Sequence, residues 1–247
     1  MPLEALEGLQ GVIHLAGENI ASARWTKRKK EEIFISRVRG SWLVSHALLR
    51  LKVPPRFFFS ASAVGYYGNR GDEILTEESR QGSGFLAEVC GKWEEASDVL
   101  KQRGVRVIHG RFGSVVDPAG GMLQRLLPIF KMGLGVQMGD GKQWMSWITR
   151  EDLVRAIEWI VFKTDLEGAV NCCSPHPVTQ KEWIDFLRHF VRRPVFLKLP
   201  KPVVRLIFGQ MGEELFLSST RVKPQKLLDS GFKFRHPMLK ENLWLTS

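Results

Sequence analysis

The sequence contains few cysteines, and their arrangement excludes several kinds of site. Only three of its 247 residues are cysteine: Cys90, Cys172 and Cys173. An odd number with two adjacent members fits neither a disulfide framework nor a C-x-x-C metal or redox site. We therefore expect reduced thiols and a cytoplasmic location, unless a segment ahead of Met1 carries an organellar address.

Long hydrophobic runs are also missing. No apolar stretch reaches the roughly 18 residues that a membrane span needs, and no signal peptide precedes the first predicted strand. We therefore expect no membrane partner. The composition, 44% hydrophobic and 25% charged, is typical of one globular domain or of one domain with a small appendage.

Positive charge exceeds negative charge, and the formal net charge of +10 favours polyanions, phosphorylated ligands or an acidic partner. The densest basic run, residues 24–30, lies inside a helical pattern and has no nucleic-acid recognition motif beside it. We interpret the run as a solvated helix face and expect no nucleic-acid partner. Nucleic-acid binding is the weaker alternative, and it predicts a steep salt dependence.

Three short apolar segments end in small residues: 11–17, 56–63 and 105–113. Such segments are typical of strands buried on both faces of a parallel sheet. A helical pattern over 26–51 separates the first two and predicts a βαβ unit with a right-handed crossover. Because ligands bind at the carboxyl ends of strands in open α/β sheets, the small residues indicate a site at that edge. The alternative for 56–68 is a core strand followed by a Ser/Gly turn.

His14 lies inside the first apolar run, and we interpret it as a core histidine whose hydrogen bonds are satisfied. The segment 65–84 is predicted to be a loop that lines the site, and the Gly-rich stretch 133–143 a substrate-side loop. Asp152, three residues after Thr149, is predicted to be structural, as part of a helix cap. The remaining predicted elements are helices over 85–103, 122–131 and 149–162, strands over 144–148 and 168–173, a helix from Thr179 and a small α+β lobe at the end of the chain.

Several ordered motifs carry a family resemblance: V-I-H-L-A-G-E-N at 12–19, S-A-S-A-V-G-Y-Y-G at 60–68, R-F-G-S-V-V at 111–116, W-I-T-R-E-D-L-V-R-A-I at 147–157 and G-A-V-N-C-C-S-P at 168–175. In this order they resemble the extended short-chain dehydrogenase/reductases. The closing S-S-T-R-V-K-P-Q-K-L-L-D-S-G-F-K-F at 218–234 resembles the C-terminal domain of epimerase family proteins, the atypical members of subfamily 39U. The resemblance covers essentially the whole chain and implies NADP(H) as cofactor.

The resemblance also implies a missing start. Family members open with a strand, a G-x-x-G-x-x-G loop and a helix that holds the pyrophosphate. The first strand of this chain resembles the family's fourth, so we expect an N-terminal truncation of about fifty residues relative to the family pattern. From this we expect an exposed edge strand, self-association such as a homodimer, and weaker NADPH binding than in a longer version.

The family's Tyr-x-x-x-Lys helix is absent, because the two tyrosines, Tyr66 and Tyr67, are followed four residues later by Arg70 and Gly71. In that motif the lysine lowers the pKa of the tyrosine, which exchanges a proton with the substrate. When the predicted helix over 85–103 is aligned on its W-E pair, Leu86 stands at the family's tyrosine position and Cys90 at its lysine position. Ser62 matches the hydroxyl that orients the substrate, and Tyr66 is the replacement acid by proximity alone.

The remaining site residues follow from the resemblance. Those matching positions that contact the cofactor are Leu15, Ala16 and Gly17 under the ribose and phosphates, Ser60 and Ala61 beside the nicotinamide ribose, and Val115 at the carboxamide. Arg37 replaces a cofactor-facing asparagine and is predicted to bind a phosphate bidentately, and Glu32 to hold a ribose hydroxyl. The alternative for these last two is a surface ion pair on one helix.

These observations predict an α/β fold with a partial, doubly wound Rossmann-type sheet. Residues 1–190 are expected to form an incomplete NAD(P)-binding domain and residues 191–247 a substrate-side lobe. The predicted function is NADP(H)-dependent hydride transfer on an unknown small carbonyl or sugar-type substrate. A non-catalytic NADP(H) sensor or scaffold is the alternative, because the acid–base motif is missing. No metal is expected.

Overall fold

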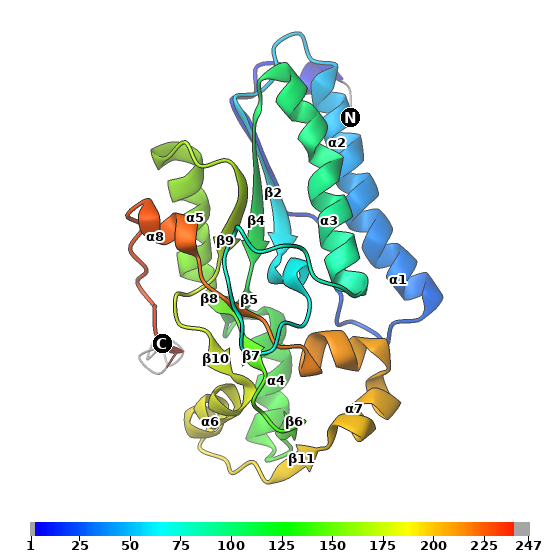
Figure 1. The fold of residues 1–247 in the computed structure, drawn as a ribbon, viewed down its shortest axis with the longest axis vertical. Helices are drawn as coiled ribbons and strands as arrows, with labels where there is room; N and C mark the ends of the chain where they lie inside the picture. The colour runs from blue at the N-terminus through cyan, green and yellow to red at the C-terminus, as the bar shows by residue number, and fades with distance from the viewer. Residues whose placement is uncertain (1–2, 240–247) are drawn as a thin grey trace.

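The structure is a computed structural model that describes residues 3–239. Its centre is a sheet of four strands in the order β1-β2-β4-β9, and every neighbouring pair is parallel. The strands are β1 (Gly11–His14), β2 (Phe57–Ala63), β4 (Arg106–Phe112) and β9 (Gly168–Cys172). Helices flank both faces (Figure 1). The predicted α/β, Rossmann-type sheet is therefore confirmed.

Alternation along the strands divides the core into two layers. Phe58 and Val107 pack with Leu48 and Leu100 on one face, whereas Phe59 and Ile108 lie in a cluster with α5 on the other face. Because successive side chains of a strand point to opposite faces, runs such as F-F-F supply both layers at once. This explains why apolar residues occupy consecutive positions in these strands, although the polar residues His109, Arg111 and Asn171 are buried among them.

The predicted helix over 26–51 is confirmed as a continuous helical segment with an irregular centre. It consists of α1 (Lys27–Phe34), a π-helical turn η2 (Ile35–Arg39) and α2 (Gly40–Leu49). Thr26 begins it, and its side-chain oxygen accepts a hydrogen bond from the Lys29 amide at 3.2 Å. π-Helical turns within helices are frequent at functional sites.

The segment after β2 contains two short elements before the next long helix. It contains η3 (Val64–Tyr67) and β3 (Ile74–Leu75), and then leads into α3 (Phe85–Asp98) and η4 (Val99–Arg103). The Glu214 carboxylate accepts hydrogen bonds from the amides of Phe85 and Leu86 at 2.9 and 2.8 Å. A distant part of the chain therefore satisfies the first amides of α3, which lacks a side-chain cap of its own.

A second group of elements lies beyond the carboxyl edge of the sheet, in the lower half of Figure 1. It includes the pairs β5–β8, β6–β11 and β7–β10, and the helices α4, α6 and α7. The bounds are β5 (Ser114–Asp117), α4 (Gly121–Lys131), β6 (Val136–Met138), β7 (Trp144–Met145), β8 (Trp147–Thr149), β10 (Val178–Thr179), α6 (Gln180–Val191), β11 (Leu197–Leu199), α7 (Lys201–Phe208) and η5 (Gly212–Leu217).

Two predictions in this region need correction. The Gly-rich stretch 133–143 is not only a loop, because β6 lies within it and pairs in parallel with β11. The predicted strand over 144–148 divides into β7 and β8. Between them, the Ser146 hydroxyl donates to the Thr220 carbonyl and accepts from the Val222 amide, at 2.8 and 2.9 Å. These bonds tie Ser146 to the C-terminal segment, and β7 and β8 pair with different strands.

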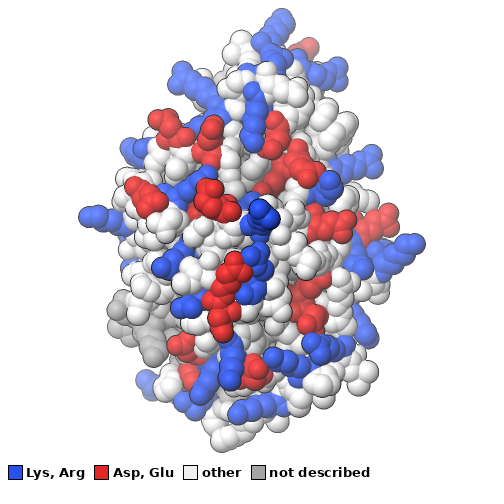
Figure 2. Space-filling view, in the orientation of Figure 1, with Lys and Arg blue, Asp and Glu red and all other residues white. Residues whose placement is uncertain are grey.

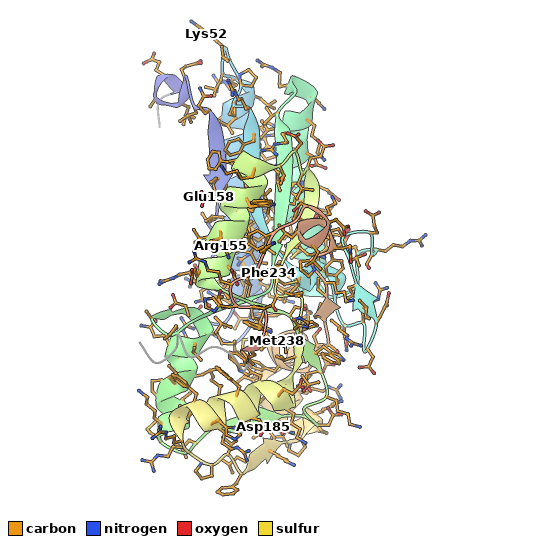
Figure 3. The ribbon with its side chains drawn as sticks, turned by 90° about the vertical axis from the view of Figure 1, so that its left-hand side faces the viewer. Lys52, Arg155, Glu158, Asp185, Phe234 and Met238 are labelled. Atoms are coloured by element: carbon orange, nitrogen blue, oxygen red, sulfur yellow. The ribbon has the colours of Figure 1, made fainter. Side chains whose placement is uncertain are left out.

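Helix α5 (Arg150–Lys163) covers the other face of the sheet, and the chain's last described segment packs against it. Thr149 caps the helix by accepting from the Asp152 amide at 3.0 Å. The Asp152 carboxylate is buried and accepts from the amides of Arg235 and His236. Figure 3 shows Arg155 and Phe234 together on this side of the molecule. The structural role predicted for Asp152 is confirmed.

The C-terminal segment returns to the main sheet. Strand β12 (Arg221–Val222) pairs in parallel with β3, and α8 (Gln225–Asp229) contacts β9. The predicted boundary between residues 190 and 191 stays a prediction. Within residues 3–239, no helix combines the length and the apolar character required to cross a membrane.

Candidate functional site

The segment after β1 presents its backbone at the carboxyl edge of the sheet. Leu15, Ala16 and Gly17 are exposed, Leu15 by 53%. A methyl group on Gly17 would lie 3.2 Å from Cζ of Arg37, so only glycine leaves the guanidinium its present position. The predicted cofactor-contacting backbone is therefore open to solvent and lies directly beside a cation.

Arg37 is a half-buried cation on the π-helical turn η2. Its Nη1 donates to the carbonyl oxygen of Glu18 at 2.9 Å, and its Cζ lies 5.2 Å from the ring centroid of Trp93. Among residues 3–239, no carboxylate lies within ion-pair distance of it, and Nε and Nη2 have no acceptor. Burial lowers the pKa of Arg37. An anion beside this guanidinium would compensate for its lost hydration.

Glu32 is not paired with Arg37, so the predicted alternative of an ion pair between the two does not occur in this structure. Its carboxylate instead lies 2.8 Å from Nε of Arg28 and 3.9 Å from Nζ of Lys29. Together with Glu18, Glu31, Ile35 and Ser36, Glu32 and Arg28 line an open pocket of about 490 Å³. Glu32 therefore faces space that a small polar ligand could fill.

The end of β2 places a buried hydroxyl against a carboxylate. Ser60, Ala61 and Ser62 are all buried, and Oγ of Ser62 donates to Oε1 of Glu94 at 2.7 Å. Val115, in β5, is half-buried and packs against the apolar cluster beneath α5. The structure thus brings the predicted Ser60–Ser62 segment to the carboxyl edge of the sheet, one strand away from residues 15–17.

A buried ion pair that the sequence analysis missed holds this end of the site. Arg111 lies opposite Ser62 in the register of β2 and β4. Its Nε and Nη2 donate to the two oxygens of Glu94 at 2.9 and 2.8 Å. Burial lowers the pKa of Arg111, but the hydrogen bonds to Glu94 and its negative charge raise that pKa more. The net shift is therefore upward. An arginine inside a strand that is buried on both faces was the available signal, because such a charge requires a partner.

The two tyrosines have different surroundings. Tyr67 is fully buried, donates to Oδ1 of Asn171 at 2.7 Å and accepts from Nη1 of Arg111 at 3.0 Å. Burial raises the pKa of Tyr67, so it remains a neutral phenol. Tyr66 is half-buried, and its ring centroid lies 3.4 Å from Cζ of Arg111. Within the described chain the Tyr66 hydroxyl has no hydrogen-bond partner, and it is the tyrosine that a substrate could reach.

Leu86 and Cys90 stand side by side on α3 next to the turn after β2. A methyl group on Gly65 would lie 3.4 Å from Cβ of Leu86 and 3.9 Å from Sγ of Cys90. Burial raises the pKa of Cys90 to about 12. Neither side chain can exchange a proton at neutral pH, which agrees with the expectation from the sequence.

The prediction for His14 was wrong in one respect. The side chain is half-buried and stacks on Phe58 at 6.3 Å, but its Nε2 is buried without a hydrogen-bond partner in the described chain. Burial lowers the pKa of His14. The histidine therefore packs against Phe58 as a half-buried residue with one unsatisfied ring nitrogen.

Charges of both signs are interspersed over the face drawn in Figure 2. No continuous basic stripe crosses the described part of that face, although lysine and arginine are frequent toward its lower end. The expectation that nucleic acid does not bind stays a prediction, to be tested by salt dependence.

Comparison with sequence families gives two matches. Residues 3–173 match the NAD dependent epimerase/dehydratase family, and residues 199–243 match a domain of unknown function (DUF1731). The epimerase family protein MT2273 of Mycobacterium tuberculosis is 41% identical over 239 residues, covering 97% of this chain and 79% of the relative. The chloroplastic SDR39U1 homolog of Arabidopsis thaliana is 33% identical, with 96% of this chain and 68% of the relative covered.

Solved structures show the same fold. Human epimerase family protein SDR39U1, isoform 2, crystallised with NADPH, superimposes with a TM-score of 0.87 at 27% identity, covering 98% of this chain and 87% of the human chain. A nucleoside-diphosphate sugar epimerase from Corynebacterium glutamicum superimposes with a TM-score of 0.80 at 32% identity, covering 99% of this chain and 47% of that one.

Proposed function

This chain belongs to the NAD-dependent epimerase/dehydratase family, within its atypical short-chain dehydrogenase/reductases, and on that premise we propose that it is an NADP(H)-dependent oxidoreductase or epimerase-like protein. Its substrate would be a small carbonyl or sugar-type molecule. The observation that carries the proposal is the hydrogen bond between the buried hydroxyl of Ser62 and Glu94 at the carboxyl edge of the sheet.

The residues at this edge fit NADP(H). The exposed backbone of residues 15–17 would lie under the ribose and phosphates, and Arg37 would pair with a phosphate through its unused Nε and Nη2 donors. Ser60, Ala61 and Val115 would surround the nicotinamide end. The human relative crystallised with NADPH supports this choice of cofactor. Bound NADP(H) supplies or accepts the hydride.

The side chains of this chain would handle the proton. Because the Ser62 hydroxyl donates to Glu94, its oxygen is left to accept a hydrogen bond from a substrate hydroxyl. As an alcohol is oxidised, its proton would pass to Ser62 while the proton of Ser62 passes to Glu94. The guanidinium of Arg111, 3.4 Å from the ring centroid of Tyr66, would stabilise negative charge on an oxygen beside it.

A non-catalytic NADP(H) sensor or scaffold is the second candidate. It is favoured by Leu86 and Cys90, which occupy the positions of the family's tyrosine and lysine and cannot exchange protons at neutral pH. General acid–base catalysis contributes typically about 10²–10⁴-fold to rate, so its loss would leave little turnover.

Turnover assays separate the two candidates. The wild-type protein would be incubated with NADPH and a panel of sugar-nucleotide, quinone and aldehyde substrates. The variants Ser62→Ala and Tyr66→Phe would then be assayed in the same way. We expect turnover that falls about 10²-fold or more in Ser62→Ala. We expect no change in Lys163→Gln, which removes an exposed charge at the end of α5, away from the site. Turnover that survives both site variants would remove the assignment of the site. No turnover on any substrate, with NADPH still bound, would favour the sensor.

A further inference from the structure

A second pocket lies away from the Ser62 site, between β12, β3, β7 and the segment that follows β9. Its volume is about 200 Å³, and we name it the Trp144 pocket. Its lining residues are Ile74, Trp144, Pro175, His176, Pro177, Arg221 and Lys223. We propose that the Trp144 pocket binds a small phosphate ester.

Strand geometry places two cations on one wall. Arg221 and Lys223 are two residues apart, so both point to the same face, whereas Val222 between them is buried. Ile74, the register partner of Arg221, shares that outer face and is 47% exposed. The wall therefore combines positive charge with an apolar contact surface, which suits an anion attached to a carbon skeleton.

The charges on this wall lack acidic partners. Within residues 3–239, neither Arg221 nor Lys223 has a carboxylate in ion-pair distance, and the guanidinium of Arg221 instead stacks on Trp144, with Cζ 4.2 Å from the ring centroid. Another lining residue, Trp144, is hydrogen-bonded to an acidic side chain, because its Nε1 donates to Oδ1 of Asp72 at 2.8 Å. Within the described chain, the guanidinium donors of Arg221 have no acceptor. A planar fork of N–H groups beside a lysine is the donor set that phosphate oxygens prefer.

Hydrogen bonds hold the walls in place. The Lys223 amide donates to the Leu75 carbonyl at 2.8 Å, and the Thr220 amide donates to the Trp144 carbonyl at 3.0 Å. On the opposite wall, the His176 carbonyl accepts from Nε1 of Trp147 at 2.9 Å. Prolines on both sides of His176 restrict that segment further. A pocket with preformed walls loses little conformational entropy on binding.

The Trp144 pocket is separate from the proposed catalytic site. Leu75 and Val222 are fully buried and pack with Tyr67 and Cys173, so an apolar layer lies between the pocket and the Tyr67 side chain. Binding there is therefore testable without any assumption about NADPH or turnover.

The experiment is calorimetric titration of the full chain with phenyl phosphate, inorganic phosphate and phenol. We expect saturable binding of phenyl phosphate at one site per chain, weaker binding of inorganic phosphate, and none of phenol. Because each charge-assisted contact is worth more than a neutral hydrogen bond, Arg221→Gln and Lys223→Gln should each weaken phenyl phosphate about tenfold. Lys163→Gln, which removes one exposed charge at the end of α5, is the matched control and should change nothing.

Three results would overturn the proposal: no saturable binding of phenyl phosphate, equal affinity in the wild type and both pocket variants, or an equal loss in Lys163→Gln, which would indicate unspecific attraction to a cationic protein. Lys223 is exposed, so Lys223→Gln should fold even if Arg221→Gln does not, and thermal unfolding of each variant verifies this.

Discussion

Arg111 and Glu94 form an ion pair whose side chains are only 5% and 12% exposed. Removing one partner of such a pair leaves a buried charge without compensation and typically costs about 3–5 kcal/mol. Substitution of Glu94 would therefore test stability as much as chemistry. Ser62→Ala removes one hydroxyl and leaves the ion pair intact, so it is the more informative change.

Glu77 is a second acidic side chain whose charged form is disfavoured by its buried surroundings. Its Oε1 accepts from the amides of Asn171 and Lys226 at 3.0 and 3.2 Å, while Oε2 is buried with no partner in the described chain. Burial raises the pKa of Glu77 above its ordinary value of 4.5. The folded protein therefore binds this proton more tightly than the unfolded chain does.

Glu77→Gln should consequently become more stabilising as the pH rises. Below the pKa that Glu77 has in the unfolded chain, Glu77 is protonated in both the folded and the unfolded wild type. Its contribution to the free energy of unfolding is then fully present. As the pH rises through the raised folded-state pKa, the wild type loses that contribution and the neutral glutamine does not. Urea unfolding at several pH values would measure the difference in unfolding free energy, with the exposed Glu78→Gln as control. A difference that stays constant with pH would contradict the explanation.

At the scale of elements, the helix from Lys27 to Leu49 shows what pattern reading can and cannot find. Its apolar and basic residues predict a helix with the correct ends within two residues. The π-helical turn η2, which carries Arg37, leaves no mark in that pattern, because one altered hydrogen-bond register changes few side-chain positions. The position of Arg37 beside Gly17 therefore could not be predicted from the sequence and became visible only in the structure.

Strands β1, β2 and β4 were predictable because each contains a short apolar run that is followed by small residues. The β6–β11 pair was not, since strands of three residues are too short to show a periodicity. The Glu94–Arg111 pair was missed for another reason. It joins α3 to β4, and only the structure shows that Arg111 lies opposite Ser62 in the sheet and that Ser62 donates to Glu94.

Strand β1 forms one edge of the described sheet, and its pairing with β2 is the single ladder that it makes within residues 3–239. Ile13 and Leu15 beside it are 44% and 53% exposed. Exposed apolar edges promote association between copies. We therefore predict that the chain self-associates, the simplest form being a homodimer.

Ile13→Lys tests this prediction, because a charge on the edge strand opposes pairing with a second copy. Sedimentation over a range of concentrations should give a dissociation constant about tenfold higher than that of the wild type. This corresponds to a loss of about 1.4 kcal/mol in association free energy. Leu206→Lys, which places a lysine at a 78% exposed position on α7, should leave association unchanged. A wild type that is monomeric at every concentration would refute the role of the edge.

At the scale of the whole molecule, the two halves of the sequence are interleaved. Strand β12 pairs with β3, Glu214 caps α3, and β11 pairs with β6. The C-terminal segment therefore reaches the loop that follows β2 and the first turn of α3, close to the Ser62 site. A substitution in the segment 199–222 can accordingly change the site through packing, without contacting a ligand.

The central claim is that the carboxyl edge of this sheet binds NADP(H) through Arg37 and the backbone beside it. Titration of the 247-residue chain with NADPH and with NADH, followed by nicotinamide fluorescence, tests it most directly. We predict saturable binding that Arg37→Ala weakens by about 1.5–3 kcal/mol, whereas Arg39→Ala, on the exposed side of the same turn, has no effect. An equal loss for both nucleotides would place Arg37 at the pyrophosphate or ribose, and a larger loss for NADPH would place it at the additional phosphate. Absence of binding, or an affinity that Arg37→Ala leaves unchanged, would contradict the claim.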